Sequence, residues 1–140
     1  MKILIAADGS QYTKRTLAYL AAHNEWLGAQ HAYTVIHCIA AIPHRAAAFL
    51  DGDQVRSYYE DDAESVFRPI RAFFAMHGIK AKFVLRIGPA AANIAKLAEQ
   101  GRFDLLLMGS HGHGAAAGLA MGSVANKVLS LCTTPMLMVR

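Results

Sequence analysis

A cluster of glycines and serines in the last third of the chain has the residue types that bind phosphate. Gly109 and Gly112 permit positive φ values and a close approach of the main chain to a ligand. Gly122 and Ser123 come just before an apolar helical pattern, where a helix start supplies unpaired N–H groups and a hydroxyl. Main-chain amides of this kind bind phosphate groups. This segment therefore predicts a site for a phosphorylated ligand.

The segment matches neither of the common short phosphate motifs. Gly109 and Gly114 have the spacing of a Walker A loop, but Ala115 and Ala116 stand where that motif requires lysine followed by serine or threonine. The first apolar run is not followed by a GxGxxG fingerprint either. Because glycine marks surface loops for many other reasons, an ordinary loop without a ligand stays open as the alternative at this point.

The sequence supports no catalytic or metal-binding arrangement. His111 and His113 have no third histidine or cysteine nearby, and a closed zinc site needs four ligands, so we expect solvated loop histidines and no metal. Ser110 and Ser123 lie in no GxSxG elbow and have no evident histidine and aspartate partners. His37 lies within an apolar run and is interpreted as a buried imidazole with satisfied hydrogen bonds. We expect no catalytic residues.

Five apolar segments are predicted to be the strands that position these residues. Residues 79–87 alternate between apolar and mostly basic side chains, which indicates a strand at the edge of the sheet with one face in water. A short apolar run at 136–139 forms the last strand. Continuous apolar runs, typical of parallel strands that are buried on both faces, occupy residues 3–7, 32–41 and 105–108.

Apolar residues at helical spacing fill the intervals between the strands. Pro69 lies inside one of these patterns, where a proline removes a hydrogen bond and costs about 3 kcal/mol, so we expect a kink or two helices there. Residues 43–52 are expected to form a loop. Capping and stop residues place the predicted helices at 10–28, 53–78, 89–101 and 124–132.

Strands that alternate with helices require crossover connections, so the sequence predicts an α/β fold. We expect an open parallel sheet in three layers, with helices on both faces, that forms a single domain over residues 1–140. A closed eightfold barrel needs far more chain. Ligands of open parallel sheets bind beyond the carboxyl ends of the strands, where the strand order reverses. Asp8 follows the first strand and the glycine cluster follows the fourth, so both lie at such ends.

Composition and charge exclude several other classes of protein. Apolar residues make up 54% of the 140 residues and charged residues 17%, which favours a packed interior over disorder. The net charge of +4 comes from scattered lysines and arginines, so we expect no nucleic-acid partner, and a small anionic ligand suits this charge. Glycines, histidines and serines interrupt the uncharged stretch 105–126, and no export signal is recognisable, so we expect a cytoplasmic protein without a membrane span. Cys38 and Cys132 are predicted to be reduced core thiols.

The spacing of the glycines is that of a known nucleotide motif. Gly109, two residues, Gly112, nine residues, then Gly122 and Ser123 reproduce the G-x2-G-x9-G-[S/T] motif of the universal stress protein family, which the chain closely resembles. The resemblance implies a five-stranded parallel sheet in the order 3-2-1-4-5, of the adenine nucleotide alpha hydrolase-like type, with the order reversing between strands one and four. It covers nearly the whole chain through the segments ILIAADGS, VIHCIA, GPAAANIAKLA, DLLLMGSHG, MGSVANKVL and TTPMLMVR.

The resemblance implies ATP as the ligand, with AMP or cyclic AMP as alternatives and with Mg²⁺ carried by the nucleotide. Asp8 matches the family aspartate beside the ribose and would accept hydrogen bonds from sugar hydroxyls, whereas the alternative is a turn residue that caps the first helix. Cys38 matches the position whose main chain meets the adenine. The positions implied for the nucleoside are Met108 and Gly109, and those implied for the phosphates are Gly112, Gly122, Ser123 and Val124.

Two positions in the implied site depart from the family pattern. Ala6 replaces a common proline at the end of the first strand, which we expect to change the shape of the site more than its charge. His111 stands where an arginine or lysine often faces the phosphates. Because an imidazole is mostly neutral at pH 7, we expect nucleotide affinity to rise as His111 becomes protonated.

The resemblance also implies a homodimer built partly on the last strand, Met136–Val139, whose edge is open to another chain. We therefore predict an ATP-binding protein that acts as a nucleotide-dependent sensor or regulator of the stress response. At most slow hydrolysis is expected, because no Walker lysine, general base or magnesium-binding carboxylate cluster lies beside the motif. The alternatives are a dimeric interaction module of the same fold that binds no nucleotide, and a true ATPase or kinase.

Overall fold

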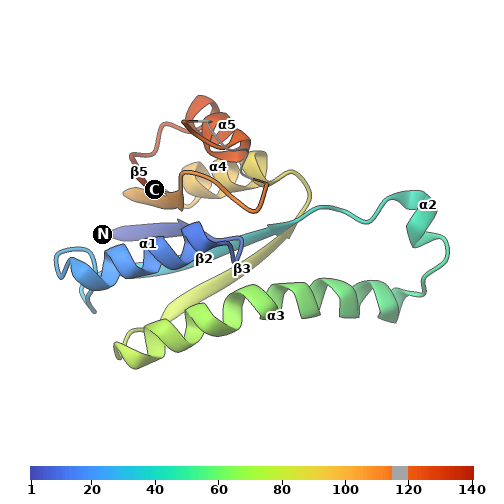
Figure 1. Ribbon diagram of the computed structural model, residues 1–140, viewed down its shortest axis with the longest axis horizontal. Helices are drawn as coiled ribbons and strands as arrows, with labels where there is room; N and C mark the ends of the chain where they lie inside the picture. Colours follow the sequence, from blue (N-terminus) through green and yellow to red (C-terminus); the bar gives the residue numbers. More distant parts are fainter. Residues whose placement is uncertain (115–119) are drawn as a thin grey trace.

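The computed structural model describes residues 1–114 and 120–140, which form a parallel sheet between two layers of helices (Figure 1). The strand order is β3-β2-β1-β4-β5 and every pairing is parallel. The predicted α/β architecture and the reversal of strand order between β1 and β4 are therefore confirmed. The strands span Lys2–Ala6 (β1), Ala32–Ile39 (β2), Ala81–Ile87 (β3), Leu105–Gly109 (β4) and Met136–Val139 (β5).

Helices cover both faces of this sheet. They span Gln11–Ala22 (α1), His44–Ala47 (α2), Gly52–Met76 (α3), Ala90–Gln100 (α4) and Ser123–Leu131 (α5). Helices α1 and α3 lie on one face and α4 and α5 on the other, while α2 and the start of α3 project beyond the sheet (Figure 1). Within residues 1–114 and 120–140, no helix combines the length and the apolar character needed to cross a membrane.

Each face of the sheet has its own hydrophobic core, because successive side chains of a strand point to opposite faces. Ile5 lies opposite Val35 and Leu107 in the neighbouring strands, and all three are fully buried against α1 and α3. Leu4 and Leu106 point the other way, into the core formed with α4 and α5. The continuous apolar runs of the sequence thus supply both cores at once.

The first helix is shorter than predicted. It ends at Ala22, where the ring Nδ1–H of His23 donates to the carbonyl oxygen of Tyr19 at 2.7 Å. The chain then turns, and the Tyr33 hydroxyl accepts from the main-chain N–H of Gly28 at 2.9 Å. Leu27 packs against the core from this turn. It is included in the predicted helix because it follows the earlier apolar residues at helical spacing, but it lies outside α1.

Helix α3 passes through Pro69 as one helix, so of the two predicted alternatives, a kink or two helices, the second is wrong. Its buried side chains lie on both sides of the proline and pack against the sheet: Ala63, Val66, Phe67, Ile70 and Phe74. Burying a large apolar side chain contributes about 1.5 to 3 kcal/mol, so together these residues outweigh the cost of about 3 kcal/mol for an interior proline. The structure also differs from the loop predicted at residues 43–52, because this segment contains the short helix α2.

The two cysteines are free thiols, as predicted, but neither is a fully buried core residue. Cys38, on β2, is half-buried because it lines the wall of a cavity. Cys132 is half-buried at the end of α5, where its Sγ lies 3.5 Å from Oε1 of Glu99. The prediction was therefore right about the redox state and wrong about the depth of burial.

Candidate functional site

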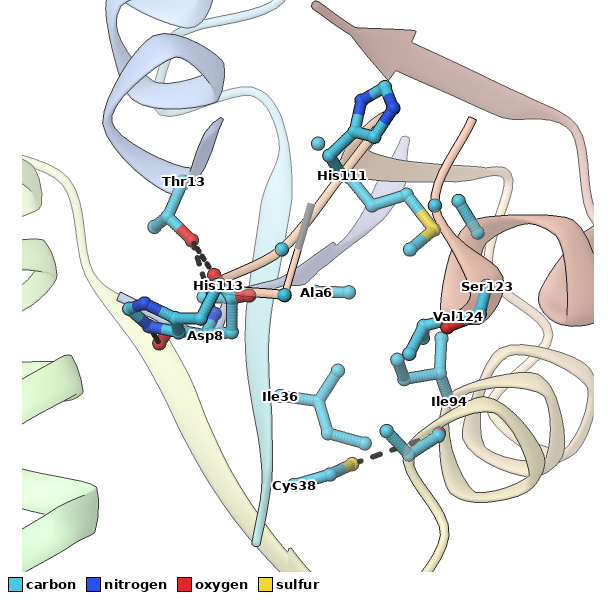
Figure 2. A pocket seen from close by; sticks show the side chains of 18 residues that line it. Ala6, Asp8, Thr13, Ile36, Cys38, Ile94, His111, His113, Ser123 and Val124 are labelled. Atoms are coloured by element: carbon cyan, nitrogen blue, oxygen red, sulfur yellow. Dashed lines mark hydrogen bonds between the residues drawn. The ribbon is translucent and has the colours of Figure 1, made fainter. Parts of the chain in front are cut away.

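A cavity of about 300 Å³ opens at the carboxyl ends of β1, β2 and β4 (Figure 2). It lies where the strand order reverses, which is where open parallel sheets bind their ligands. Helices α4 and α5 form its other wall through Ile94 and Val124. A volume of this size is at the lower end of the range of about 300 to 1,000 Å³ that is usual for small-molecule sites.

All ten residues that the sequence predicted for the site line this one cavity. They lie in four separate stretches of the chain, which the parallel sheet brings to one edge. The ten are Ala6, Asp8, Cys38, Met108, Gly109, His111, Gly112, Gly122, Ser123 and Val124.

One end of the cavity is apolar. Ile36 and Cys38 of β2 face Ile94 of α4 there, and the Cys38 thiol donates a weak hydrogen bond to the carbonyl oxygen of Ala90 at 3.9 Å (Figure 2). Burial raises the pKa of Cys38 to about 11, although the positive charge of Arg86 opposes the shift. The thiol is therefore protonated at neutral pH, and this end carries no charge from it.

Asp8 dominates the polar end of the cavity. Its Oδ1 accepts hydrogen bonds from the main-chain N–H of Ser10 at 2.9 Å and from the Thr13 hydroxyl at 3.0 Å. Its other oxygen, Oδ2, faces Gly112, where an added Cβ would lie 2.6 Å from it. Burial raises the pKa of Asp8, but the hydrogen bonds from Ser10 and Thr13 and the charge of His113 outweigh burial and lower the pKa overall. The carboxylate is therefore ionised at neutral pH.

Glycines line the cavity because the chain segments approach each other closely. A Cβ added at Gly112 would lie 2.6 Å from Oδ2 of Asp8, and one added at Gly109 would lie 2.4 Å from Cβ of Tyr12. Neither Gly109 nor Gly112 has a positive φ, so that part of the prediction is wrong. These two positions require glycine for space, and a larger side chain would displace the neighbouring segment.

The start of α5 supplies main-chain donors to the cavity. Gly122 is the N-cap residue and has no side chain with which to cap the helix, and its N–H donates to the carbonyl oxygen of Ser110 at 2.7 Å. The next amides, those of Ser123 and Val124, belong to the first turn, where N–H groups have no acceptor within the helix. The positive end of the helix dipole lies at the same point, so the geometry favours an anion.

Two histidines flank this polar region from the loop after β4. Nδ1 of His111 lies 2.9 Å from the Ser110 hydroxyl, and its ring packs 5.2 Å from the ring of Tyr12. Nε2–H of the exposed His113 donates to the main-chain carbonyl oxygen of Asp8 at 2.7 Å. In the part of the chain that the structure describes, no three His, Cys, Asp or Glu side chains converge as metal ligands.

His37 is buried behind the cavity, as predicted for an imidazole with satisfied hydrogen bonds. Its Nδ1–H donates to the carbonyl oxygen of Ala7 at 2.9 Å, and its Nε2 lies 2.9 Å from Oδ2 of Asp62 on α3. The ring also packs edge-on against Phe67. These contacts tie α3 to the end of β1, one residue before Asp8.

Several lining residues were missed by the sequence reasoning because most of them carry no polar group. Ile36 is two residues from Cys38 and so shares its face of β2, which was a usable signal. Ala90 and Ile94 are one turn apart on α4 and enter the cavity only through the packing of that helix. The others are Ala7, Thr13, His113, Gly114 and Ala125. Residues 115–119, which include Ala115 and Ala116 and form part of the nine-residue segment of the motif, lie outside the described residues.

The whole chain, residues 1–140, matches the family model described as the universal stress protein family. The chain belongs to this family. Within it, a universal stress protein of Thermus aquaticus, described as lying in the QAH/OAS sulfhydrylase 3'region, is 30% identical over 139 residues. That match covers 99% of this chain and 97% of the relative.

Solved structures show the fold shared by the family. The structure of protein MJ0577, the universal stress protein of that name in Methanocaldococcus jannaschii, has a TM-score of 0.83 at 24% identity and covers 99% of this chain and 94% of its own. A family protein from Arabidopsis thaliana with AMP bound has a TM-score of 0.71 at 12% identity, with 99% and 90% covered. A universal stress protein in complex with cAMP has a TM-score of 0.68 at 18% identity, and the match covers 100% of this chain and 97% of that protein. A universal stress protein from Archaeoglobus fulgidus in complex with dAMP has a TM-score of 0.62 at 14% identity, with 100% and 98% covered.

Proposed function

We propose that the cavity binds an adenine nucleotide, with ATP as the principal ligand and Mg²⁺ carried by the nucleotide. The observation that carries this proposal is the order of chemical environments along the cavity. An apolar end at Cys38 leads to an ionised carboxylate at Asp8 and then to the first-turn amides of Ser123 and Val124. A nucleotide has the same order of base, sugar and phosphate.

The base would lie at the apolar end. Ile36, Cys38 and Ile94 offer flat, uncharged walls there, and the small side chains of Ala6 and Ala90 leave room for a planar ring. The main chain of β2 at Cys38 supplies polar groups for the edge of the ring. A protonated thiol, held toward the carbonyl of Ala90, adds no charge that would oppose an uncharged base.

The ribose and the phosphates would occupy the polar end. Oδ2 of Asp8 is placed to accept a hydrogen bond from a sugar hydroxyl, while Oδ1 is held by Ser10 and Thr13. The phosphates would meet the main chain of Gly112 and the first turn of α5 at Ser123 and Val124. Met108, Gly109 and Gly122 complete the walls between these groups, and His111 would lie at the phosphate end.

The relatives support the same ligand class. Structures that share this fold are complexes with AMP, cAMP and dAMP, which have the adenine base and a phosphate in common. We propose that the protein is a nucleotide-dependent sensor or regulator of the stress response in the cytoplasm and that it hydrolyses ATP at most slowly. The cavity brings an anion-binding helix start to the nucleotide, and phosphoryl transfer would need positioned charges beyond that.

We also propose that the protein acts as a homodimer that pairs through β5. This four-residue edge strand is apolar, and each of its residues is only half-buried in the single chain. The main-chain groups along an unpaired edge can join a second strand. A second copy of β5 would supply both the hydrogen bonds and the apolar cover.

The first prediction tests binding by isothermal titration calorimetry with ATP, AMP and cyclic AMP. We expect the wild-type chain to bind ATP well below millimolar concentration. The Asp8→Asn variant should bind ATP about tenfold or more weakly, because a hydrogen bond to a charged acceptor is lost. Asp53→Asn, an exposed position on α3, is the matched control and should leave the affinity unchanged.

Millimolar or weaker binding of all three nucleotides by the wild type would contradict the proposal. That outcome would favour the dimeric interaction module, which shares the fold and needs no ligand. Turnover of ATP in the usual enzyme range of about 1 to 1,000 per second would instead favour an ATPase or kinase.

A further inference from the structure

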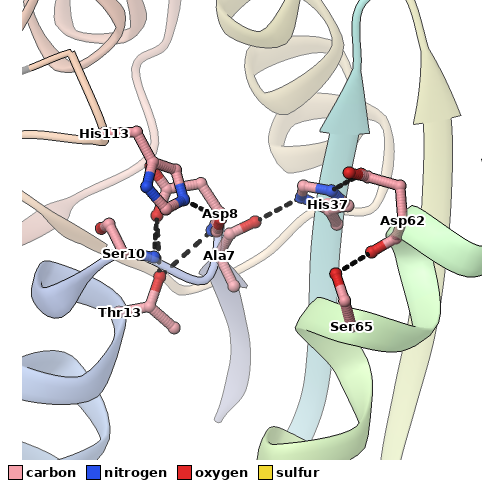
Figure 3. Close-up of polar contacts among 8 residues, drawn as sticks. All are labelled: Ala7, Asp8, Ser10, Thr13, His37, Asp62, Ser65 and His113. Carbon is pink, nitrogen blue, oxygen red and sulfur yellow. Dashed lines mark hydrogen bonds and ion pairs between the residues drawn. The ribbon is translucent and has the colours of Figure 1, made fainter.

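Two imidazoles donate to consecutive main-chain carbonyls at the end of β1. His37, on β2, donates through Nδ1–H to the carbonyl oxygen of Ala7 at 2.9 Å, and His113 donates through Nε2–H to the carbonyl oxygen of Asp8 at 2.7 Å (Figure 3). The peptide that carries the Asp8 side chain is therefore held from both sides. Its position depends on two residues that come from different parts of the chain.

The two imidazoles differ in burial and in what their second nitrogen faces. His37 is buried, and its Nε2 faces the carboxylate of Asp62, so both of its ring nitrogens are engaged. His113 is exposed, and among the described residues it pairs only with Asp8, through the hydrogen bond and through the attraction between their charges. Its Nδ1 is thus open to solvent or to a ligand. Of the two, His113 is the one that solvent and a ligand can reach.

The hydrogen bond of His113 closes the loop after β4 over the end of β1. It joins residues that are 105 positions apart and come from opposite sides of the switch point. Gly112, the preceding residue, approaches Oδ2 of Asp8 so closely that an added Cβ would lie 2.6 Å from it. The loop is therefore held to Asp8 by one hydrogen bond, and the space beside the carboxylate admits no side chain at position 112 without a shift.

We propose that His113 is a positioning residue of the nucleotide site, which orients Asp8 and whose protonation strengthens binding of the anionic ligand. This inference rests on the proposed function. It goes beyond the expectation from the family motif, which pointed to His111. Because a carbonyl oxygen can only accept, Nε2 carries its hydrogen in both charge states, and the contact with Asp8 persists when Nδ1 gains or loses a proton.

The sign of the pH effect follows from the charges around His113. His113 contacts Asp8, His111 lies two residues before it in the same loop, and the pair of His37 and Asp62 lies behind the Ala7–Asp8 peptide. An imidazole changes its charge between about pH 5 and 8. A bound polyphosphate favours the protonated imidazole, so nucleotide binding should strengthen as the pH falls from 8 to 6.

The test compares ATP affinity at pH 6 and pH 8 for matched variants, measured by isothermal titration calorimetry. In the wild type we expect about two- to fivefold tighter binding at pH 6, the effect of an exposed charge pair. His113→Gln keeps a donor for the Asp8 carbonyl but cannot gain a proton, so this variant should lose that part of the pH dependence. His113→Ala should bind more weakly than the wild type at both pH values.

Two further variants separate the histidines. His111→Gln removes the imidazole at the phosphate end and should leave in place the part of the pH dependence that His113→Gln removes, and His44→Gln on α2, remote from the cavity, should change neither affinity nor ratio. Retention of the wild-type ratio in His113→Gln would overturn the assignment.

A measurement without nucleotide distinguishes failure of this inference from failure of the proposed function. In the ligand-free protein, the ¹³C resonance of the Asp8 carbonyl should move in His113→Ala and stay near its wild-type position in His113→Gln. If the wild type binds no nucleotide but the resonance behaves in this way, the proposed function fails and the positioning contact stands. An unmoved resonance in His113→Ala would refute the contact itself.

Discussion

The two oxygens of the Asp8 carboxylate serve different chemical purposes. Oδ1 accepts from Ser10 and Thr13 and so fixes the turn between β1 and α1, while Oδ2 is the oxygen that we propose accepts from a ribose hydroxyl. The two alternatives drawn from the sequence, a ribose acceptor and a turn residue, are therefore compatible. The N-cap itself is Ser10, whose hydroxyl accepts from the N–H of Tyr12 at 3.2 Å.

Gly112 gives the sharpest steric test at the residue scale. In Gly112→Ala the new methyl group must push the Asp8 carboxylate aside, so we expect ATP affinity to fall about tenfold, the loss of one charged hydrogen bond, while the circular dichroism spectrum is retained. Gly52→Ala, at the exposed start of α3, adds the same methyl group where no described atom lies within 4 Å, and it should bind like the wild type. Equal affinities of the two variants would argue against Asp8 as the ribose acceptor. Gly122 is a poorer target, because a Cβ there would press on the main chain of Ser110 and His111.

At the scale of elements, the cavity and the open edge of the sheet are joined by main-chain hydrogen bonds. The N–H of Gly122 donates to Ser110 at 2.7 Å, and the N–H of Ser110 donates to Val139 at 2.8 Å. The start of α5, the loop after β4 and the end of β5 are thus linked in series. Glu99 of α4 fixes the segment before β5, since its Oε1 accepts from the N–H and hydroxyl of Thr133 at 2.7 and 2.9 Å.

The proposed dimer can be tested with a proline on the outer side of β5. The carbonyls of Pro135 and Val139 accept from the N–H groups of Leu106 in β4 and of Ser110 just after it, so by alternation the main-chain N–H of Met138 points away from the sheet. Met138→Pro should therefore spare the β4–β5 ladder but remove a donor from the open edge. We expect light scattering after size exclusion to show about twice 15.1 kDa for the wild type and 15.1 kDa for the variant. Met138→Ala is the control and should remain dimeric; a monomeric wild type at micromolar concentration would exclude pairing through β5.

The pattern of elements could be predicted where apolar side chains mark both the type and the extent of an element. β1, β2 and β4 are visible as continuous apolar runs, and the alternation in β3 revealed its edge position. The end of α1 could not be predicted, because Leu27 packs against the core from a turn held by Tyr33, a contact between different elements. The same applies to Pro69, whose cost is offset by packing that only the tertiary structure reveals.

The site was predictable to the extent that its residues carry a motif or a charge. Asp8 and the glycines were found because of their chemistry and spacing, whereas Ile94 depends on where α4 crosses the cavity. The hydrogen bond between His113 and Asp8 joins residues 105 positions apart, and nothing in the spacing of the loop indicates it. Sequence reasoning therefore recovers Asp8, the glycines and the positions that the family resemblance implies, and it misses Thr13, His113 and the part of the apolar wall around Ile94.

At the scale of the whole molecule, the ionised Asp8 makes the stability of the protein depend on acid pH. The hydrogen bonds from Ser10 and Thr13 hold the pKa of Asp8 below its ordinary value in the folded chain, so the unfolded chain binds more protons there and the free energy of unfolding falls as the pH decreases from about 5 through the folded pKa. Asp8→Asn cannot be protonated, so we expect its stability to fall less over this range. Urea denaturation between pH 3 and pH 6 measures both slopes. Asp53→Asn is the control, and identical slopes for the wild type and Asp8→Asn would contradict the role given to Ser10 and Thr13.

The division of the interior into two cores has a practical consequence for spectroscopy. Trp26, the one tryptophan in the sequence, packs against the core beneath α1 and α3, whereas the apolar wall of the cavity belongs to the core beneath α4 and α5. Its indole is therefore shielded by the sheet from any molecule in the cavity. The emission of Trp26 offers an intrinsic optical reporter that follows global unfolding even in saturating nucleotide, without quenching by direct contact with the base.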